Sequence, residues 1–206
     1  MNSNKRTRGV SGGAHANAPG RVRIIGGAWR SRRIGVIARA GLRPTPDRVR
    51  ETLFNWLGQD LSGLACLDLY AGSGALGFEA ASRGAARVVM IEADRAALKA
   101  LEKNRLELEA SQVEIAGGGA LEYLERARAR FDVVFLDPPF RQNAVPALLG
   151  RLPARLREGA RVYVEAERPV EAVSPWRELK RARAGGVSYQ LFEWSAHDPS
   201  GVSGNV

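Results

Sequence analysis

Apolar residues in the middle of the chain fall into short runs separated by longer amphipathic segments. The short runs predict buried strands at 64–70, 87–91, 113–115, 133–136 and 161–164. The segments between them have helical periodicity and span 75–83, 95–110, 120–128 and 144–156. This alternation predicts an α/β fold, a parallel sheet covered by helices on both faces. Two further runs, 178–183 and 187–194, flank a Gly pair and predict an antiparallel closing pair.

Residues 21–42 have a different pattern, in which apolar and basic residues alternate around Gly26 and Gly27. This pattern predicts a small hairpin with arginines on its open face. A helix is predicted to begin near Asp47, a residue type typical of N-caps, and to end near Gly58. The polar, Gly-rich ends of the chain, 1–20 and 196–206, are predicted to be disordered.

Positive charge is concentrated at the N-terminal end. Residues 1–50 contain twelve Lys and Arg and one acid, Asp47, so this segment carries +11 and the other 156 residues carry −2. A basic arm on a nearly neutral core is typical of proteins that bind a polyanion, because such charges displace counterions from phosphates. We therefore expect a nucleic-acid partner. The alternative is a basic tail that only promotes solubility.

Cysteine and histidine offer little chemistry in this sequence. Cys66, the one cysteine, lies in an apolar run and is expected to be a core residue. His15 and His197 lie in the polar ends without a partner at ligand spacing, so we expect no metal site. The chain has neither a secretory signal nor an apolar run of membrane-spanning length, and we expect a cytoplasmic protein.

A glycine-rich turn follows the first predicted strand, in the order Ala71-Gly72-Ser73-Gly74-Ala75-Leu76-Gly77. Glycines there allow the backbone to approach a ligand, and the next helix presents free N–H groups. Glu92 ends the following strand, where a carboxylate can accept hydrogen bonds from ribose hydroxyls. Asp68, just before the turn, would repel a pyrophosphate and would position either a cofactor ammonium group or the turn itself. The turn indicates a nucleotide-like cofactor, and Asp68 favours S-adenosylmethionine over a dinucleotide.

The strand at 133–136 ends in Asp137-Pro138-Pro139-Phe140. Prolines donate no hydrogen bond, so this segment offers the Asp137 carboxylate, the Pro138 carbonyl and an aromatic ring. Two acceptors that hold the hydrogens of an exocyclic NH₂ group direct the nitrogen lone pair toward a methyl donor, and Phe140 can stack on the base. The motif predicts methyl transfer to an amino nitrogen.

The sequence resembles the bacterial RsmD family at these motifs and at two N-terminal blocks. The blocks are Ile24-Ile25-Gly26-Gly27-x-Trp29-Arg30 and the segment from Leu42 to Leu57, which contains Arg-Pro-Thr. The resemblance covers about residues 21–195. It implies a Rossmann-like class I methyltransferase sheet of seven strands, the last antiparallel, with a small basic N-terminal hairpin and helix. It also implies a 16S ribosomal RNA guanine-N2 methyltransferase that acts on one loop guanine in an assembled or partly assembled small subunit.

We expect an RNA-binding hairpin and helix over 21–60 and a methyltransferase domain over 61–195, in a protein that acts as a monomer. Positions matched to the family suggest the following roles: Asp137, Pro138 and Phe140 at the target amine; Gly72, Ser73, Gly74 and Glu92 at the cofactor; Arg43, Thr45 and Arg48 at the RNA or the cofactor. Beyond the matched positions, Asp68, Gly119 and Ala120 are expected at the cofactor, and Arg30, Arg32 and Arg33 of the basic arm are expected at the RNA. An alternative role for Arg43, Thr45 and Arg48 is structural, either as the N-terminal cap of a helix or in a surface salt bridge. Residues 117–120 read Gly-Gly-Gly-Ala where relatives often carry Asp or Asn, so backbone groups would recognise the adenine.

Three other functions fit part of the pattern. The first is the same chemistry on DNA adenine N6, another RNA or a protein glutamine. The second is a nicotinamide-dependent oxidoreductase, which leaves residues 137–140 without a role. The third is a non-catalytic RNA-binding assembly factor.

Overall fold

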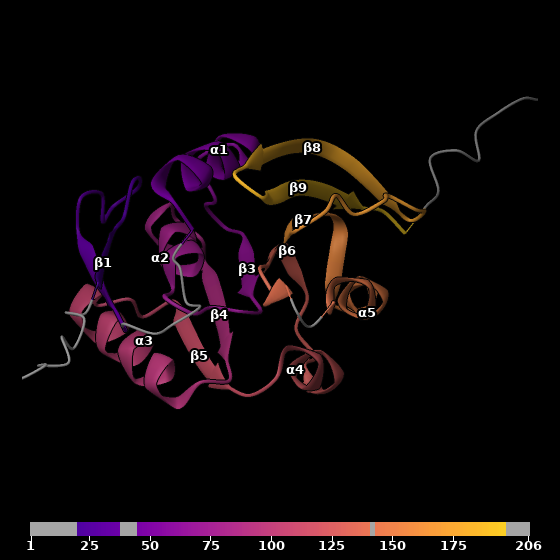
Figure 1. Cartoon of the computed structure of the whole chain (residues 1–206). Helices are drawn as coiled ribbons and strands as arrows, with labels where there is room; N and C mark the ends of the chain where they lie inside the picture. The colour runs from indigo at the N-terminus through magenta and orange to yellow at the C-terminus, as the bar shows by residue number, and fades with distance from the viewer. Residues whose placement is uncertain (1–19, 38–44, 141–142, 197–206) are drawn as a thin grey trace, which may run out of the picture.

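The computed structural model describes residues 20–37, 45–140 and 143–196, and within them one seven-stranded sheet forms the centre of the molecule (Figure 1). The strand order is β5-β4-β3-β6-β7-β9-β8. The strands are β3 (Ala65–Asp68), β4 (Arg87–Glu92), β5 (Val113–Gly117), β6 (Phe131–Leu136), β7 (Leu156–Ala166), β8 (Trp176–Ala184) and β9 (Val187–Trp194).

Strands β3 to β7 run parallel, whereas β9 pairs antiparallel with both β7 and β8. The strand that comes last in the sequence therefore lies inside the sheet in the antiparallel direction. This arrangement confirms the predicted α/β fold with an antiparallel last strand.

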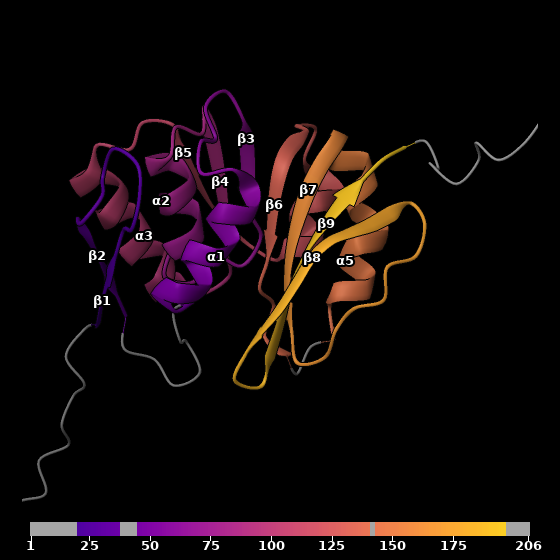
Figure 2. The same ribbon diagram turned by 90° about the horizontal axis from the view of Figure 1, so that it is seen from above.

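Helices cover both faces of the sheet (Figure 2). One face packs against α1 (Asp47–Leu57), α2 (Ala75–Ser82) and α3 (Arg95–Leu108). The other packs against α4 (Ala120–Arg126) and α5 (Val145–Arg151). Two hydrophobic clusters result, one on each side of the sheet, because successive side chains of a buried strand point to opposite faces. No helix in the described part of the chain has the length and apolar character needed to cross a membrane.

The predicted N-terminal hairpin is present as β1 (Gly20–Arg23) and β2 (Arg33–Val36), which pair antiparallel. Its apolar side chains are buried and its arginines are exposed, as the alternation predicts. Asn104 of α3 fixes the position of β2, because its side-chain amide accepts from the Gly35 N–H and donates to the Gly35 carbonyl, both at 2.9 Å. The hairpin thus shares its core with α1, α2 and α3.

Two details of the sequence prediction were wrong. The helix expected over 144–156 ends at Arg151 and continues as the 3-10 turn η2 (Leu152–Arg155), after which β7 begins at Leu156. Pro153 has no N–H for a helical bond, while the apolar spacing continues through the turn. Asp47 is also not the N-cap: Pro46 occupies that position, and the Asp47 carboxylate pairs with Arg50 instead. The two predicted tails lie almost wholly outside the described residues.

Candidate active site

The glycine turn lies between the end of β3 and the start of α2. Gly72 and Gly74 have φ values of 50° and 77°, and Gly74 is the N-cap residue of α2. A Cβ atom at Gly74 would lie 2.6 Å from carbon atoms of both Leu101 and Phe78. Glycine is therefore required at position 74 for two reasons: the backbone is in the left-handed region, and the neighbouring side chains leave no room for a Cβ atom.

Glu92, at the end of β4, joins the loops on either side of it. Its carboxylate accepts hydrogen bonds from the Gly72 N–H and the Asp94 N–H, each at 2.8 Å. Its own carbonyl accepts from the Gly118 N–H at 3.0 Å. Each carboxylate oxygen retains a second lone pair for a ligand hydroxyl. The structure therefore brings Glu92, the glycine turn and the segment leading to Gly119 and Ala120 to one edge of the sheet.

Asp68 is fully buried beneath the glycine turn. Its carboxylate accepts from the Gly77 N–H of α2 at 3.2 Å and from the backbone of Tyr70. Burial raises the pKa of Asp68 to about 7, and hydrogen bonds from Tyr70 and Gly77 limit the rise. Of the two roles expected for Asp68, positioning of the turn is the one that these contacts show.

Asp137 and Pro138 continue β6 beyond its last residue, at the same edge of the sheet. Among the described residues, none donates a hydrogen bond to the Asp137 carboxylate or to the Pro138 carbonyl. Burial raises the pKa of Asp137 well above its usual range, and the nearby charges of Glu165 and Asp68 raise it further. Phe140 is 39% exposed, so part of its ring is available to a ligand.

Glu165, which the sequence reasoning missed, is the last residue but one of β7 and lies beside Asp137. The Tyr163 hydroxyl donates to its Oε1 atom at 2.8 Å, and the Thr45 hydroxyl donates to the same atom at 3.4 Å. Burial raises the pKa of Glu165, whereas these two hydrogen bonds lower it. The available signal was an acidic residue directly after an apolar strand, at the edge where ligands gather in α/β sheets.

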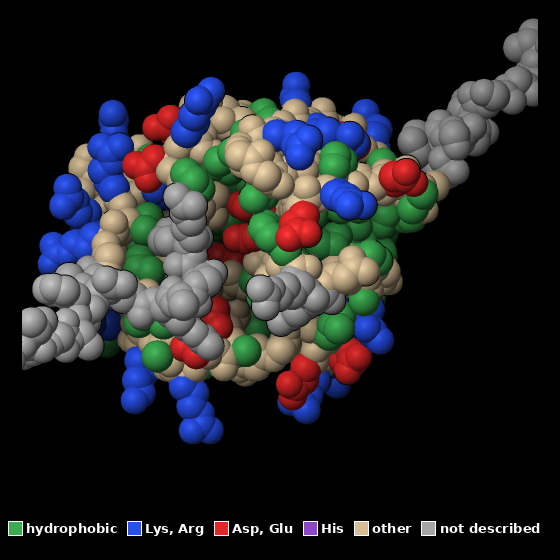
Figure 3. Space-filling view, in the orientation of Figure 1, with side chains coloured by type: hydrophobic (Ala, Val, Ile, Leu, Met, Phe, Trp, Pro, Cys, Tyr) green, Lys and Arg blue, Asp and Glu red, His purple; other side chains and the backbone are tan. Residues whose placement is uncertain are grey.

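Asp68, Asp137 and Glu165 belong to adjacent strands or their immediate continuations. Phe135 of β6 pairs with Asp68 of β3 and with Tyr163 of β7, so these three side chains share a face of the sheet. Asp137 and Glu165 lie two residues after Phe135 and Tyr163, and side chains two residues apart on a strand point to the same face. The three carboxyl groups therefore point to the same side of the sheet. Figure 3 shows acidic side chains at the bottom of a hollow in the middle of the molecule, whereas most Lys and Arg side chains lie toward the outer edge of this face. Such a site offers acceptors to the hydrogens of a ligand and favours a cationic group.

The hairpin arginines expected at the RNA lie apart from this edge (Figure 1). Arg30, Arg32 and Arg33 are exposed on the hairpin, and Arg32 donates to the Glu107 carbonyl at the end of α3. Arg30 also lines a polar cavity of about 500 Å³ between the hairpin, α1 and Arg83. Arg48 is exposed on α1, and Arg43 lies outside the described residues. Thr45 is buried, with its hydroxyl turned to Glu165.

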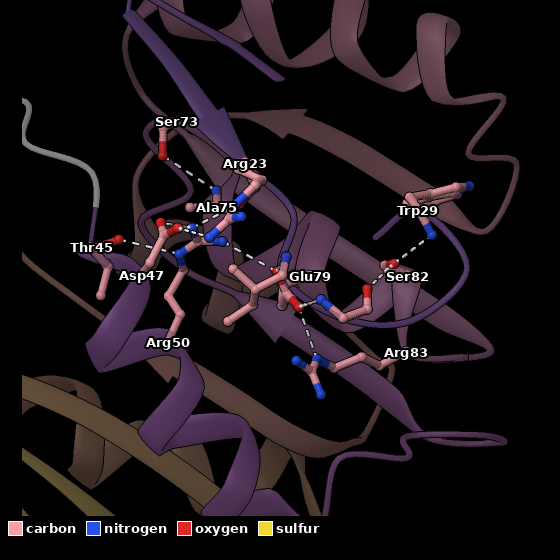
Figure 4. A network of polar contacts seen from close by, with 12 residues as sticks. Arg23, Trp29, Thr45, Asp47, Arg50, Ser73, Ala75, Glu79, Ser82 and Arg83 are labelled. Carbon is pink, nitrogen blue, oxygen red and sulfur yellow. Dashed lines mark hydrogen bonds and ion pairs between the residues drawn. The ribbon is translucent and has the colours of Figure 1, made fainter. Parts of the chain in front are cut away.

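A buried polar network connects the hairpin and α1 to α2 (Figure 4). Glu79 of α2 accepts from the N–H groups of Ile25 and Gly26 at 2.9 and 2.8 Å. It also pairs with Arg50 and Arg83. Arg50 donates in turn to the Thr45 carbonyl at 3.2 Å. One carboxylate thus holds together the hairpin, α1 and the helix that follows the glycine turn.

The fold and the edge site define a class of proteins, the methyltransferases with a Rossmann-like sheet. An RNA methyltransferase of Salinibacter ruber, solved with S-adenosyl-L-homocysteine, shares this fold at a TM-score of 0.57 and 23% identity, over 79% of this chain and 100% of that one. The Escherichia coli protein yhhF is more similar, with a TM-score of 0.79 and 42% identity over 86% of this chain and 100% of that one.

The family model described as "Conserved hypothetical protein 95" matches residues 22–193. A Haemophilus influenzae protein named "Ribosomal RNA small subunit methyltransferase D" is 44% identical over 185 residues, which is 86% of this chain and 96% of the relative. The chain belongs to this family of small-subunit RNA methyltransferases, as the resemblance in sequence implied.

Proposed function

We propose that this protein transfers a methyl group from S-adenosylmethionine to the exocyclic N2 of one guanine in 16S ribosomal RNA. The observation that carries the proposal is the row of hydrogen-bond acceptors at residues 137, 138 and 165, on the same sheet edge as the glycine turn. The name of the Haemophilus influenzae relative supports ribosomal RNA of the small subunit as the substrate.

The residues around the glycine turn fit S-adenosylmethionine. Glu92 has free lone pairs for the ribose hydroxyls, and its carboxylate places negative charge where a pyrophosphate would be repelled. Gly72, Ser73 and Gly74 shape the turn against the cofactor, and backbone groups of Gly119 and Ala120 lie on the adenine side. When bound, the cofactor supplies a methyl group activated by a sulfonium centre.

The target amine needs orientation, because the lone pair of an exocyclic NH₂ is delocalised into the base. The Asp137 carboxylate and the Pro138 carbonyl accept its two hydrogens, and Phe140 stacks on the extruded ring. The N–C bond forms as the C–S bond breaks, and the proton that the nitrogen loses passes to Asp137. Burial, which raises the pKa of Asp137, makes this carboxylate a better proton acceptor.

The exposed arginines are proposed to bind the phosphates of the RNA around the site. Arg30, Arg32 and Arg33 serve this role on the hairpin, and Arg43 and Arg48 serve it near α1. Thr45 acts inside the site through Glu165. We further propose that a monomer acts in the cytoplasm on the small subunit or an assembly intermediate, with the hairpin and α1 as the RNA-binding unit.

Mass mapping of 16S RNA from cells with and without the gene tests the proposal. The expected result is one guanine that carries a single methyl group on N2 only when the gene is present. Transfer of labelled methyl groups to small subunits, free 16S RNA and duplex DNA then identifies the substrate. Label in DNA alone, or an RNA map that does not depend on the gene, contradicts the proposal. Tight binding of NAD without binding of S-adenosylhomocysteine contradicts the cofactor assignment.

A further inference from the structure

Glu165 lies at a position from which it can contact the same base as Asp137. Leu136, the last residue of β6, pairs with Val164 of β7. The residues that follow them, Asp137 and Glu165, are therefore neighbours at the edge of the sheet. Adjacent strands are about 4.8 Å apart, and paired positions project to the same face. The negative charge of Glu165 also raises the pKa of Asp137, in keeping with this register.

Two hydroxyl groups fix the orientation of the Glu165 carboxylate. Tyr163, two residues earlier on β7, and Thr45, before α1, both donate to Oε1. No described residue donates to Oε2. Glu165 therefore presents one oriented acceptor beside the acceptors of Asp137 and Pro138. Glu165 is itself buried, and a buried carboxylate is costly unless hydrogen-bond donors surround it.

Guanine supplies the donor that this arrangement lacks. Its Watson–Crick edge carries an N1–H next to the N2 amino group. In adenine and cytosine the ring nitrogen next to the amino group is instead an acceptor, and uracil has no amino group. An edge with two adjacent donor groups fits a row of acceptors that comes from two neighbouring strands.

We propose that Glu165 selects guanine by accepting a hydrogen bond from its N1–H through Oε2, while Asp137 and Pro138 hold the N2 amino group. This inference rests on the proposed function and assigns a specificity-determining residue to the same site. An amino purine without the N1–H would place a lone pair against the Glu165 carboxylate and leave this buried group without a donor.

The test uses 2-aminopurine, which has the 2-amino group of guanine but an acceptor at N1. Once mapping has located the modified guanine, small subunits are reconstituted with guanine or 2-aminopurine at that position. The wild-type protein should methylate guanine at least about 100-fold faster, as measured by kcat/KM. Glu165→Gln keeps an oxygen for Tyr163 and Thr45 and turns an NH₂ group toward N1. It should reduce methylation of guanine and increase that of 2-aminopurine, so that the preference disappears or reverses.

Glu167→Gln is the matched control, since Glu167 is exposed two residues further along the chain and should retain the wild-type preference. Equal rates of the wild-type protein on both bases overturn the inference, as does an equal loss on both bases in Glu165→Gln. If Glu165→Gln does not fold, Tyr163→Phe removes a donor that orients Glu165 and should lower the preference several-fold; an unchanged preference then overturns it. Failure of the proposed function is distinguishable, because the wild-type protein would not methylate guanine N2.

Discussion

Arg50 of α1 and Glu79 of α2 form an ion pair in which both side chains are fully excluded from solvent, with 3.2 Å between Nη1 and Oε2. All the remaining nitrogens of the Arg50 guanidinium donate as well, to the Thr45 and Arg23 carbonyls and to Asp47. The pair fixes the hairpin and α1 on the helix that follows the glycine turn. Arg50 also fixes the backbone of Thr45, and the side-chain hydroxyl of Thr45 donates to Glu165.

Replacement of Arg50 by Met should destabilise the protein by about 3–5 kcal/mol, because Glu79 loses a buried partner. The matched control is Arg48→Met on the same helix, where the side chain is exposed and the change should be within about 0.5 kcal/mol. Urea denaturation monitored by circular dichroism measures both. Equal stability of the two variants would show that the buried pair does not hold α1 in place.

Replacement of Asp137 by Ala should lower methyl transfer by at least about 100-fold, because the target amine loses an acceptor that orients it. RNA affinity should remain near that of the wild-type protein, since the exposed arginines are unchanged. Asp132→Ala is the control: Asp132 belongs to the same strand, but at its other end, where it accepts from Ala65 N–H and Arg157. Single-turnover transfer and filter binding separate the two effects, and undiminished transfer by Asp137→Ala would remove this residue from the mechanism.

Replacement of Gly74 by Ala should weaken binding of S-adenosylhomocysteine and lower stability. The residue has φ of 77°, and the added Cβ would clash with Leu101 and Phe78. Gly150→Ala in α5 provides the contrast, because nothing lies within 4 Å of its added Cβ. That change should be neutral or stabilise by up to about 1 kcal/mol. Calorimetric titration and thermal unfolding measure both variants, and unchanged affinity in Gly74→Ala would contradict the role of the turn.

Asp68 should make stability depend on pH in an unusual direction. Its pKa is raised from near 4 to about 7, so the folded chain holds this proton more tightly than the unfolded chain. Its contribution to stability is therefore most favourable below pH 4 and falls between pH 4 and 7, by up to about 1.4 kcal/mol per pH unit. Asp68→Asn lacks this titrating group, so its own pH profile should lack this fall. The stability of the wild type relative to the variant should therefore decrease from pH 4 to pH 7, as measured by denaturation across that range.

Glu114 provides a comparison, because its pKa is shifted in the opposite direction to that of Asp68. A hydrogen bond from Arg87 lowers the pKa of Glu114, so its contribution is present at neutral pH and is lost as the pH falls below its ordinary value. Glu114→Gln should therefore change stability mainly at neutral pH. Parallel pH profiles for Asp68→Asn and Glu114→Gln would contradict the assignment of a raised pKa to Asp68.

Replacement of Arg30, Arg32 and Arg33 by Gln should weaken binding to 16S RNA and flatten its salt dependence. Three lost phosphate contacts lower the slope of log affinity against log salt by about 2. The control removes three exposed arginines from the part of the molecule around α4 and α5, far from the hairpin in Figure 1: Arg126, Arg130 and Arg151. Filter binding at several salt concentrations measures the RNA affinity of the hairpin variant and of the control variant. If the two variants have the same slope of log affinity against log salt, the hairpin does not bind phosphates.

The sequence by itself determined the order of strands and helices, the glycine turn and the two acidic residues Asp68 and Asp137 at strand ends. These features have local signatures: an apolar run, a helical period, or a polar residue directly after a buried strand. The parallel sheet then follows, and it brings the carboxyl ends of its strands to one edge. The same local reasoning was wrong at 144–156, where apolar spacing continues through η2 while Pro153 ends the helical bonding.

Only the tertiary structure decided which polar residues meet. Thr45 and Glu165 are 120 positions apart in the sequence, and Arg50 and Glu79 are 29 apart. A charged residue in a sequence pattern usually indicates an exposed position, so Arg50, Glu79 and Glu165 give no local sign that they are buried. Their partners depend on the register between β6 and β7 and on the packing of α1 against α2. Packing is a property of the assembled core, because the burial of each of these charges is favourable only when its partner is already in place.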